Sequence, residues 1–166
     1  MNAQNILKIS VLAAAMGMVS SGAFAADNDD QTITYEVTAI NEIAVSGNPG
    51  NLTVSTATAG SQPDAVTDDS TTYAITTNGT NKRITAALDE AMPANVTLSL
   101  TATAPAGGAS SSGKVALTAS AQSVVTGITQ VAESEIGLEY ELSATVAAGI
   151  VASDTVDVTL TIADAG

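Results

Sequence analysis

The sequence predicts an all-β protein, an antiparallel β-sandwich of about eight or nine short strands. Three observations predict it. Apolar and polar residues alternate with a period of two in several segments, which is typical of half-buried strands. Stretches rich in Gly, Pro and Asn separate these segments and indicate turns. Only 13% of the 166 residues are charged, so the long charged side chains of amphipathic surface helices are scarce.

The first 25 residues have the pattern of a secretory signal peptide. A short polar start with Lys8 precedes a mostly apolar run over residues 9–24, and Ala23-Phe24-Ala25 supplies the small residues of a cleavage site. The run is short and contains Ser and Gly, which disfavours a membrane anchor of about 20 residues. We therefore expect residues 26–166 to form one exported domain, which passes the periplasm of a bacterium and works outside the cell or at its surface.

Composition excludes several classes of function. The chain has no Cys and no His, which excludes disulfides, Cys nucleophiles, Ser-His-Asp triads and ordinary zinc sites. Without the leader, three cations face 17 acidic residues, a net charge of about −14. This charge repels nucleic acid and anionic lipid. We expect no enzyme, no nucleic-acid partner and no membrane span.

The first predicted strand covers residues 32–40. Its apolar positions alternate with Thr and Glu, and they are Ile33, Tyr35, Val37 and Ala39. After an expected kink at Ile40-Asn41, the pattern continues with Ile43 and Val45. A turn over residues 47–50 precedes a short predicted strand with Leu52 and Val54, and residues 57–70 have no periodicity and are expected to form a loop.

Residues 71–88 are predicted to form a hairpin. A four-residue turn, Asn78-Gly-Thr-Asn81, would pair Ile75 with Ile84, Tyr73 with Ala86, and Thr71 with Leu88. A two-residue turn at Asn78-Gly79 would instead place Ile75 opposite Lys82. Since the buried face sets the register, we favour the four-residue turn.

The middle of the chain is predicted to hold two paired strands and one ambiguous segment. A strand over residues 96–102 pairs with one over residues 115–119, so that Leu100 lies opposite Leu117 and Ala102 opposite Val115. In residues 121–134 the apolar side chains have helical spacing, but Gly127 and β-branched neighbours weaken a helix. Helix and strand both remain open there.

The C-terminal part alternates most regularly. Residues 138–146 and 156–162 are predicted to form a hairpin that pairs Val146 with Val156, Leu142 with Leu160, and Tyr140 with Ile162. Together with the earlier segments, these strands and turns are typical of a sandwich of immunoglobulin-like type.

No pattern in the chain predicts a catalytic cleft. The adjacent acids Asp29-Asp30, Asp68-Asp69 and Asp89-Glu90 are interpreted as surface charge. Residues 108–114 approach the phosphate-loop pattern, but Val115 occupies the position of its magnesium-binding Ser or Thr, and a strand is expected to follow, so we interpret them as a hairpin loop. No cofactor is expected. Calcium alone remains open, at Asp27-Asn-Asp-Asp30 or at Asp64 with Asp68-Asp69, although neither has EF-hand spacing.

An acidic lead, the alternating residues 32–40 and an equally regular strand over residues 155–162 resemble bacterial fimbrial subunits and related secreted filament proteins. These proteins are immunoglobulin-like sandwiches that donate an N-terminal strand to a neighbour. The resemblance implies a structural or adhesive subunit of an extracellular filament, matrix or surface layer. Its partners would be other copies of itself or a surface protein. The candidate donor positions are Ile33, Tyr35, Val37 and Ala39.

Two alternatives accompany this hypothesis. Residues 33–39 could be the first strand of their own sandwich. The protein could also be a secreted binding module for glycan or a surface partner, with tyrosines as stacking platforms, of which the chain has three.

Overall fold

The computed structural model describes residues 28–165. The predicted signal peptide, residues 1–25, lies outside this range. The chain divides into two units, Met1–Glu36 and Val37–Gly166. In the described part of the first unit, residues 28–36 form neither strand nor helix. The second unit holds all the strands described below.

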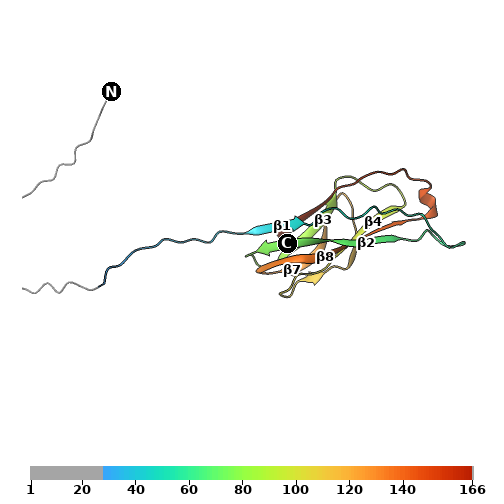
Figure 1. The fold of residues 1–166 in the computed structure, drawn as a ribbon. Coiled ribbons are helices and arrows are strands. Elements are labelled where there is room, and N and C mark those ends of the chain that lie inside the picture. Colours follow the sequence, from blue (N-terminus) through green and yellow to red (C-terminus); the bar gives the residue numbers. More distant parts are fainter. Residues whose placement is uncertain (1–27, 166) are drawn as a thin grey trace, which may run out of the picture. The chain divides into compact units, whose positions relative to one another are not determined.

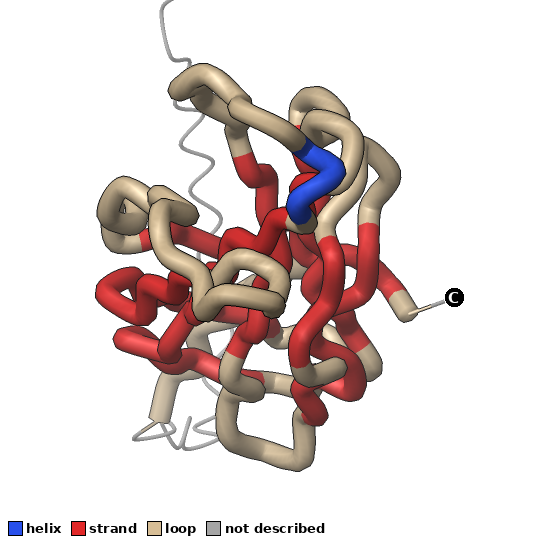
Figure 2. The backbone as a smooth tube through the Cα atoms, turned by 90° about the vertical axis from the view of Figure 1, so that its right-hand side faces the viewer, coloured by secondary structure: helices blue, strands red, loops and turns tan. Residues whose placement is uncertain are grey.

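Two antiparallel sheets make up the second unit (Figures 1 and 2). The five-stranded sheet has the order β1-β2-β8-β4-β6, and the four-stranded sheet has the order β5-β7-β3-β9. Their bounds are β1 Asn41–Val45, β2 Val66–Thr77, β3 Lys82–Leu88, β4 Val96–Ala102, β5 Ser110–Ser111, β6 Lys114–Ala116, β7 Gln122–Ile128, β8 Val131–Ala144 and β9 Val158–Asp164. One 3-10 turn, η1 (Val146–Ala148), follows β8. The expected all-β, sandwich-like fold is therefore confirmed at this level.

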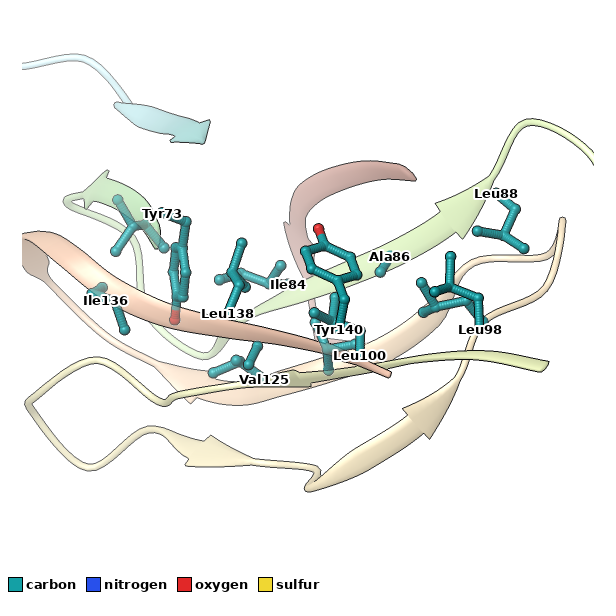
Figure 3. Close-up of a cluster of buried hydrophobic side chains, with 14 of the residues drawn as sticks. Tyr73, Ile84, Ala86, Leu88, Leu98, Leu100, Val125, Ile136, Leu138 and Tyr140 are labelled. Carbon is teal, nitrogen blue, oxygen red and sulfur yellow. The ribbon is translucent and has the colours of Figure 1, made fainter. Parts of the chain in front are cut away.

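The core consists of apolar side chains from five of the strands, β2, β3, β4, β7 and β8, together with Leu117 (Figure 3). Tyr73 is almost completely buried, and its hydroxyl donates a hydrogen bond of 2.6 Å to the carbonyl oxygen of Thr103. This bond satisfies the one polar group that the Tyr73 side chain brings into the core. No helix in the described part of the chain is long and apolar enough to cross a membrane.

The predicted hairpin over residues 71–88 is wrong. β2 pairs with β1 and β8, whereas β3 pairs with β7 and β9, so residues 78–81 connect the two sheets. The predicted inward side chains are nevertheless buried: Thr71, Tyr73, Ile75, Ile84, Ala86 and Leu88. A period of two specifies which face is buried. It does not distinguish a neighbour in the same sheet from a partner across the core.

The predicted C-terminal hairpin is wrong for the same reason. β8 lies in the five-stranded sheet and β9 in the four-stranded sheet. Leu142 lies opposite Val66 and Leu98, and Leu160 lies opposite Ala86. The two other predicted pairs are lost as well, because Tyr140 and Ile162 lie in different sheets, Val146 falls in η1, and Val156 precedes β9.

The remaining segments differ in smaller ways. β4 and β6 are neighbours as predicted, but Leu100 lies opposite Val115, a shift of two residues that keeps the same faces inward. Residues 122–128 form strand β7 and no helix, and Gly127 has a positive φ of 73° there. Leu52 and Val54 are half-buried but form no strand, and β2 begins at Val66, inside the predicted loop.

Candidate functional site

One side of the sandwich is open, along the seam between β1 and β9. β1 is an edge strand of the five-stranded sheet, and β9 is an edge strand of the four-stranded sheet. Each has a single neighbour within the described residues, β2 for β1 and β3 for β9. The outer edge of β9 therefore presents backbone groups that no described strand pairs, and such an edge is a ready template for another strand.

The inward side chains of β9 are incompletely covered. Val158, Leu160 and Ile162 lie directly opposite three inward residues of β3, in the order Leu88, Ala86 and Ile84. The β3 side chains are 4%, 0% and 0% exposed, whereas all three β9 side chains are only half-buried. Because the two rows share one face of one sheet, the difference arises from what lies over β9. The apolar layer that covers β3 covers β9 only in part.

Two hollows lie along this seam. The smaller, of about 240 Å³, is lined by Ile43, Ala44, Val45, Val158 and Leu160. The larger, of about 790 Å³, lies between residues 52–57 and residues 151–156, and its apolar lining includes Leu52, Val54, Met92, Leu142 and Val156. Residues 52–57 follow β1 and residues 151–156 precede β9, so neighbouring parts of the same two stretches of chain contribute to both hollows. We call them together the seam groove.

The two ends of the sandwich differ. At one end, which we call the clasp end, the loop of residues 78–81 meets residues 130 and 165, through Gln130 N–H to Gly79 O at 2.9 Å and Ala165 N–H to Asn81 O at 3.1 Å. At the other, the groove end, lies the larger hollow with η1 beside it. β9 runs from the groove end to the clasp end, since Val158 follows the wall of the larger hollow and Asp164 lies opposite Lys82.

Asn78 holds the chain just before β1. Its side-chain oxygen accepts the Ile40 N–H at 2.9 Å, its side-chain nitrogen donates to Thr38 O at 2.8 Å, and its backbone N–H donates to Ile40 O at 3.3 Å. These bonds continue the β1–β2 ladder beyond the pair of Asn41 and Thr77. Ala39 lies inside this clasp, so it is tied to its own domain and differs from the other three predicted donor positions.

Within the described residues, no strand precedes the clasp. We call residues 28–37 the N-terminal segment. The strand predicted over residues 32–40 is not formed, and the side chains of Ile33, Tyr35 and Val37 are 77%, 89% and 80% exposed. The structure describes no strand over residues 33–39. Alternation predicts that a segment suits a sheet edge, but it does not specify whose edge.

Two of the predicted calcium ligands, Asp64 and Asp68, accept hydrogen bonds from neighbouring side chains. Hydrogen bonds from the hydroxyl and backbone N–H of Ser70 hold the pKa of Asp68 below its ordinary value. Asp64 accepts a bond of 3.0 Å from the Thr56 hydroxyl. Within residues 28–165, no three His, Cys, Asp or Glu side chains are grouped so that they could hold a metal ion. Asp27 lies outside this range.

Two further candidates have structural roles. Lys114, the last residue of the phosphate-loop-like segment, begins β6 and forms an ion pair with Glu141 at 3.0 Å. Tyr73 and Tyr140 are buried, and burial raises the pKa of both phenols. Tyr35 is the one tyrosine with an exposed ring.

Sequence reasoning found the N-terminal segment but missed the seam groove and the Asn78 clasp. The regular pattern of residues 156–162 identified β9 as a strand, but an edge position depends on which strands fold beside it. No family model, curated protein or solved structure matches the chain, so the functional interpretation depends on the geometry described above.

Proposed function

We propose that the protein is a secreted structural subunit of a bacterial extracellular filament, matrix or surface layer, whose copies are linked by N-terminal strand donation. The observation that carries this proposal is a complementarity. The N-terminal segment exposes three alternating apolar side chains, and β9 has a free edge with three half-covered apolar side chains at the same spacing. Addition of a strand to β9 would cover both rows.

An immunoglobulin-like topology is part of the proposal. In that fold one sheet has the strand order A-B-E-D and the other contains C, F and G in that order. The order β1-β2-β8-β4 supports the first sheet, and the neighbours β3 and β9 support strands C and F. The place of strand G is then beside β9, where the described residues contain no strand. A donated strand would take that place.

The energy available is sufficient for a specific contact. Burial of Ile33, Tyr35 and Val37 contributes roughly 1.5–3 kcal/mol for each side chain. Backbone hydrogen bonds along β9 add to it, and the half-exposed row of β9 is covered at the same time. Lost translational, rotational and side-chain freedom offsets part of this gain. Ala39 lies between Thr38 and Ile40, which Asn78 binds, and is left out of the donated row.

The binding module for glycan or a surface partner has less support. Two of the three tyrosines are buried, so they offer no exposed ring for stacking on a sugar. The remaining one, Tyr35, lies in the N-terminal segment between Ile33 and Val37, where strand donation already gives it a role.

Paired substitutions in the full-length mature protein test the proposed function. The Ile33→Asp/Val37→Asp variant places two charges on the apolar row, and the Thr32→Asp/Thr34→Asp variant places the same two charges on the opposite face of the segment. We expect the first variant to remain monomeric in light scattering and negative-stain microscopy, while the control assembles. Equal assembly of both variants, or a wild-type protein that stays monomeric at high concentration with salt and calcium present, would refute strand donation.

A further inference from the structure

We infer that Asn78 is a site of spontaneous deamidation, and that this modification opens the Asn78 clasp irreversibly. The reacting groups are the Asn78 side-chain amide, the backbone nitrogen of Gly79 and water. The inference concerns the chain just before β1, and it stands whether or not copies of the protein assemble. It follows from the residue after Asn78, from the exposure of the loop, and from the way in which the clasp uses the amide.

The residue after Asn78 favours this reaction. Asn78 is the only asparagine in the sequence that precedes a glycine. The Gly79 nitrogen, once it has lost its proton, attacks the carbonyl carbon of the Asn78 side chain, and ammonia leaves as a cyclic imide closes. Water then opens the imide at either carbonyl to give aspartate or isoaspartate, so the net change is uptake of one water and release of one ammonia. Glycine places no side chain beside the attacking nitrogen.

The loop that contains Asn78 is accessible to water. Asn78 is exposed, and the hydrogen bonds of its side chain lie at the surface. Hydrolysis at this side chain therefore requires no opening of the core. The backbone beside it is less free, because the Gly79 N–H donates to the Thr77 hydroxyl at 3.0 Å and the Gly79 carbonyl accepts the Gln130 N–H at 2.9 Å. Ring closure consequently depends on transient local opening of the loop.

The closed clasp slows the reaction. Ring closure turns the Asn78 side chain toward its own backbone, whereas the clasp holds its oxygen on the Ile40 N–H at 2.9 Å and its nitrogen on the Thr38 carbonyl at 2.8 Å. Both bonds must break before the side chain reaches Gly79. Since one such hydrogen bond changes a local equilibrium roughly fivefold, we expect deamidation to be at least about fivefold slower in the folded protein than in the unfolded chain.

The product cannot restore the clasp. A carboxylate has no N–H to donate, so the hydrogen bond to the Thr38 carbonyl is lost and two oxygen atoms face each other there. Isoaspartate also inserts one carbon atom into the main chain, directly before Gly79, whose carbonyl binds Gln130. We therefore expect residues 38–40 to detach. The modification works in one direction, because opening of the clasp permits it and the product prevents closure.

Three variants of the mature protein separate the effect of the clasp from that of the local sequence. Ile40→Pro removes the N–H that the Asn78 oxygen accepts. Thr38→Pro is the matched control, because it keeps the carbonyl that the Asn78 nitrogen binds. Gly79→Ala shields the attacking nitrogen, and its added carbon displaces chiefly the flexible end of the Lys82 side chain. Deamidation is followed at mildly alkaline pH by peptide mass spectrometry, as a mass increase of about 1 Da.

The inference predicts a distinct rate for each folded variant. Wild type should deamidate at residue 78 before any other asparagine. Ile40→Pro should deamidate there about fivefold faster, in proportion to the one hydrogen bond that it lacks. Thr38→Pro should react like the wild type, and Gly79→Ala should react slowest. In urea, where no clasp exists, wild type and the two proline variants should react at one common, faster rate.

Two results would overturn the inference. One is a folded wild type that keeps its amide at residue 78 while the unfolded chain reacts to completion, and the other is an equal rate in folded wild type and Ile40→Pro. The consequence for the clasp is measured separately, in aged wild type and in Asn78→Asp, where amide hydrogen exchange of Ile40 should accelerate. Unchanged exchange of Ile40 in both would show that the modification leaves the clasp closed, and the inference would be wrong.

Discussion

Asn78 joins two parts of the chain that are 38 residues apart in sequence. Its amide both accepts from Ile40 and donates to Thr38, so a single exposed side chain fixes where the N-terminal segment begins. A carboxylate at this position could only accept, and an aliphatic side chain could do neither. The clasp is therefore specific to an amide side chain.

Replacement of Asn78 by Ala should release residues 38–40 and leave the core intact. The two lost side-chain bonds are at the surface, so we expect a loss of about 1 kcal/mol in the free energy of unfolding, measured by urea denaturation. Amide hydrogen exchange of Ile40 should accelerate at the same time. Thr80→Ala, in the same exposed loop, is the control and should change neither quantity. Unchanged exchange of Ile40 in Asn78→Ala would show that the clasp does not hold the chain.

Tyr73 links stability to alkaline pH. Burial, and after it the negative charge of Glu133, raises the pKa of this phenol well above its ordinary value. The unfolded chain ionises near the ordinary tyrosine pKa of about 10, whereas the folded chain keeps the proton. The free energy of unfolding should therefore fall as the pH rises above about 10. Urea denaturation between about pH 8 and 11 should show a shallower decline in Tyr73→Phe, with the rest of the decline due to the buried Tyr140. An identical slope in both proteins would contradict this assignment.

The strands show which properties a period of two can predict. Tyr73 and Ile75 in β2 and Ile84 and Ala86 in β3 are buried, as the alternation predicts. Their neighbours were mispredicted because four residues, 78–81, can close a hairpin or cross to the other sheet, and both choices bury the same faces. The seam groove could not be predicted either, because it exists only once β9 pairs with β3 alone. The exposed N-terminal segment was identified as a strand candidate from Ile33, Tyr35 and Val37, whereas the structure describes no strand there.

β9 differs from a core strand in how much its side chains contribute to the free energy of unfolding of the monomer. Leu100 in β4 is completely buried, and its replacement by Ala should cost about 2–5 kcal/mol. Leu160 in β9 is half-buried, so Leu160→Ala should cost clearly less in a monomer. The two variants should rank the other way in assembly. Leu160→Ala should weaken association more than Leu100→Ala, because the donated strand packs on the row of β9 side chains that contains Leu160. Urea denaturation of dilute protein and light scattering of concentrated protein measure the two effects. A Leu160→Ala variant as unstable as Leu100→Ala would indicate that the seam is closed.

Charge opposes contact between whole molecules. The described chain carries few cations, and Lys82 and Lys114 are already paired with Asp164 and Glu141. The donor itself adds Asp29, Asp30 and Glu36 to an acidic acceptor. Assembly must therefore depend on burial of apolar surface and on backbone hydrogen bonds, with electrostatic repulsion as the opposing force.

Screening should consequently promote assembly. The Debye length falls from about 30 Å at 0.01 M salt to about 8 Å at 0.15 M, so we expect the concentration at which light scattering increases to drop as salt is added. The Ile33→Asp/Val37→Asp variant is the control and should show no increase at either ionic strength. Assembly that weakens with added salt would mean that attraction between charges, rather than the apolar row, links the copies.

Binding of the isolated segment to an acceptor that cannot donate is the decisive measurement. The Ile33→Asp/Val37→Asp protein keeps its seam groove but lacks a functional donor. A synthetic peptide of residues 28–38 should bind it saturably with one peptide per protein in calorimetry and should raise its Tm, because ligand that binds only the folded state stabilises it. The same peptide with both Asp substitutions should do neither. If the unmodified peptide fails to bind, or if both peptides bind equally, the seam groove does not accept the N-terminal segment.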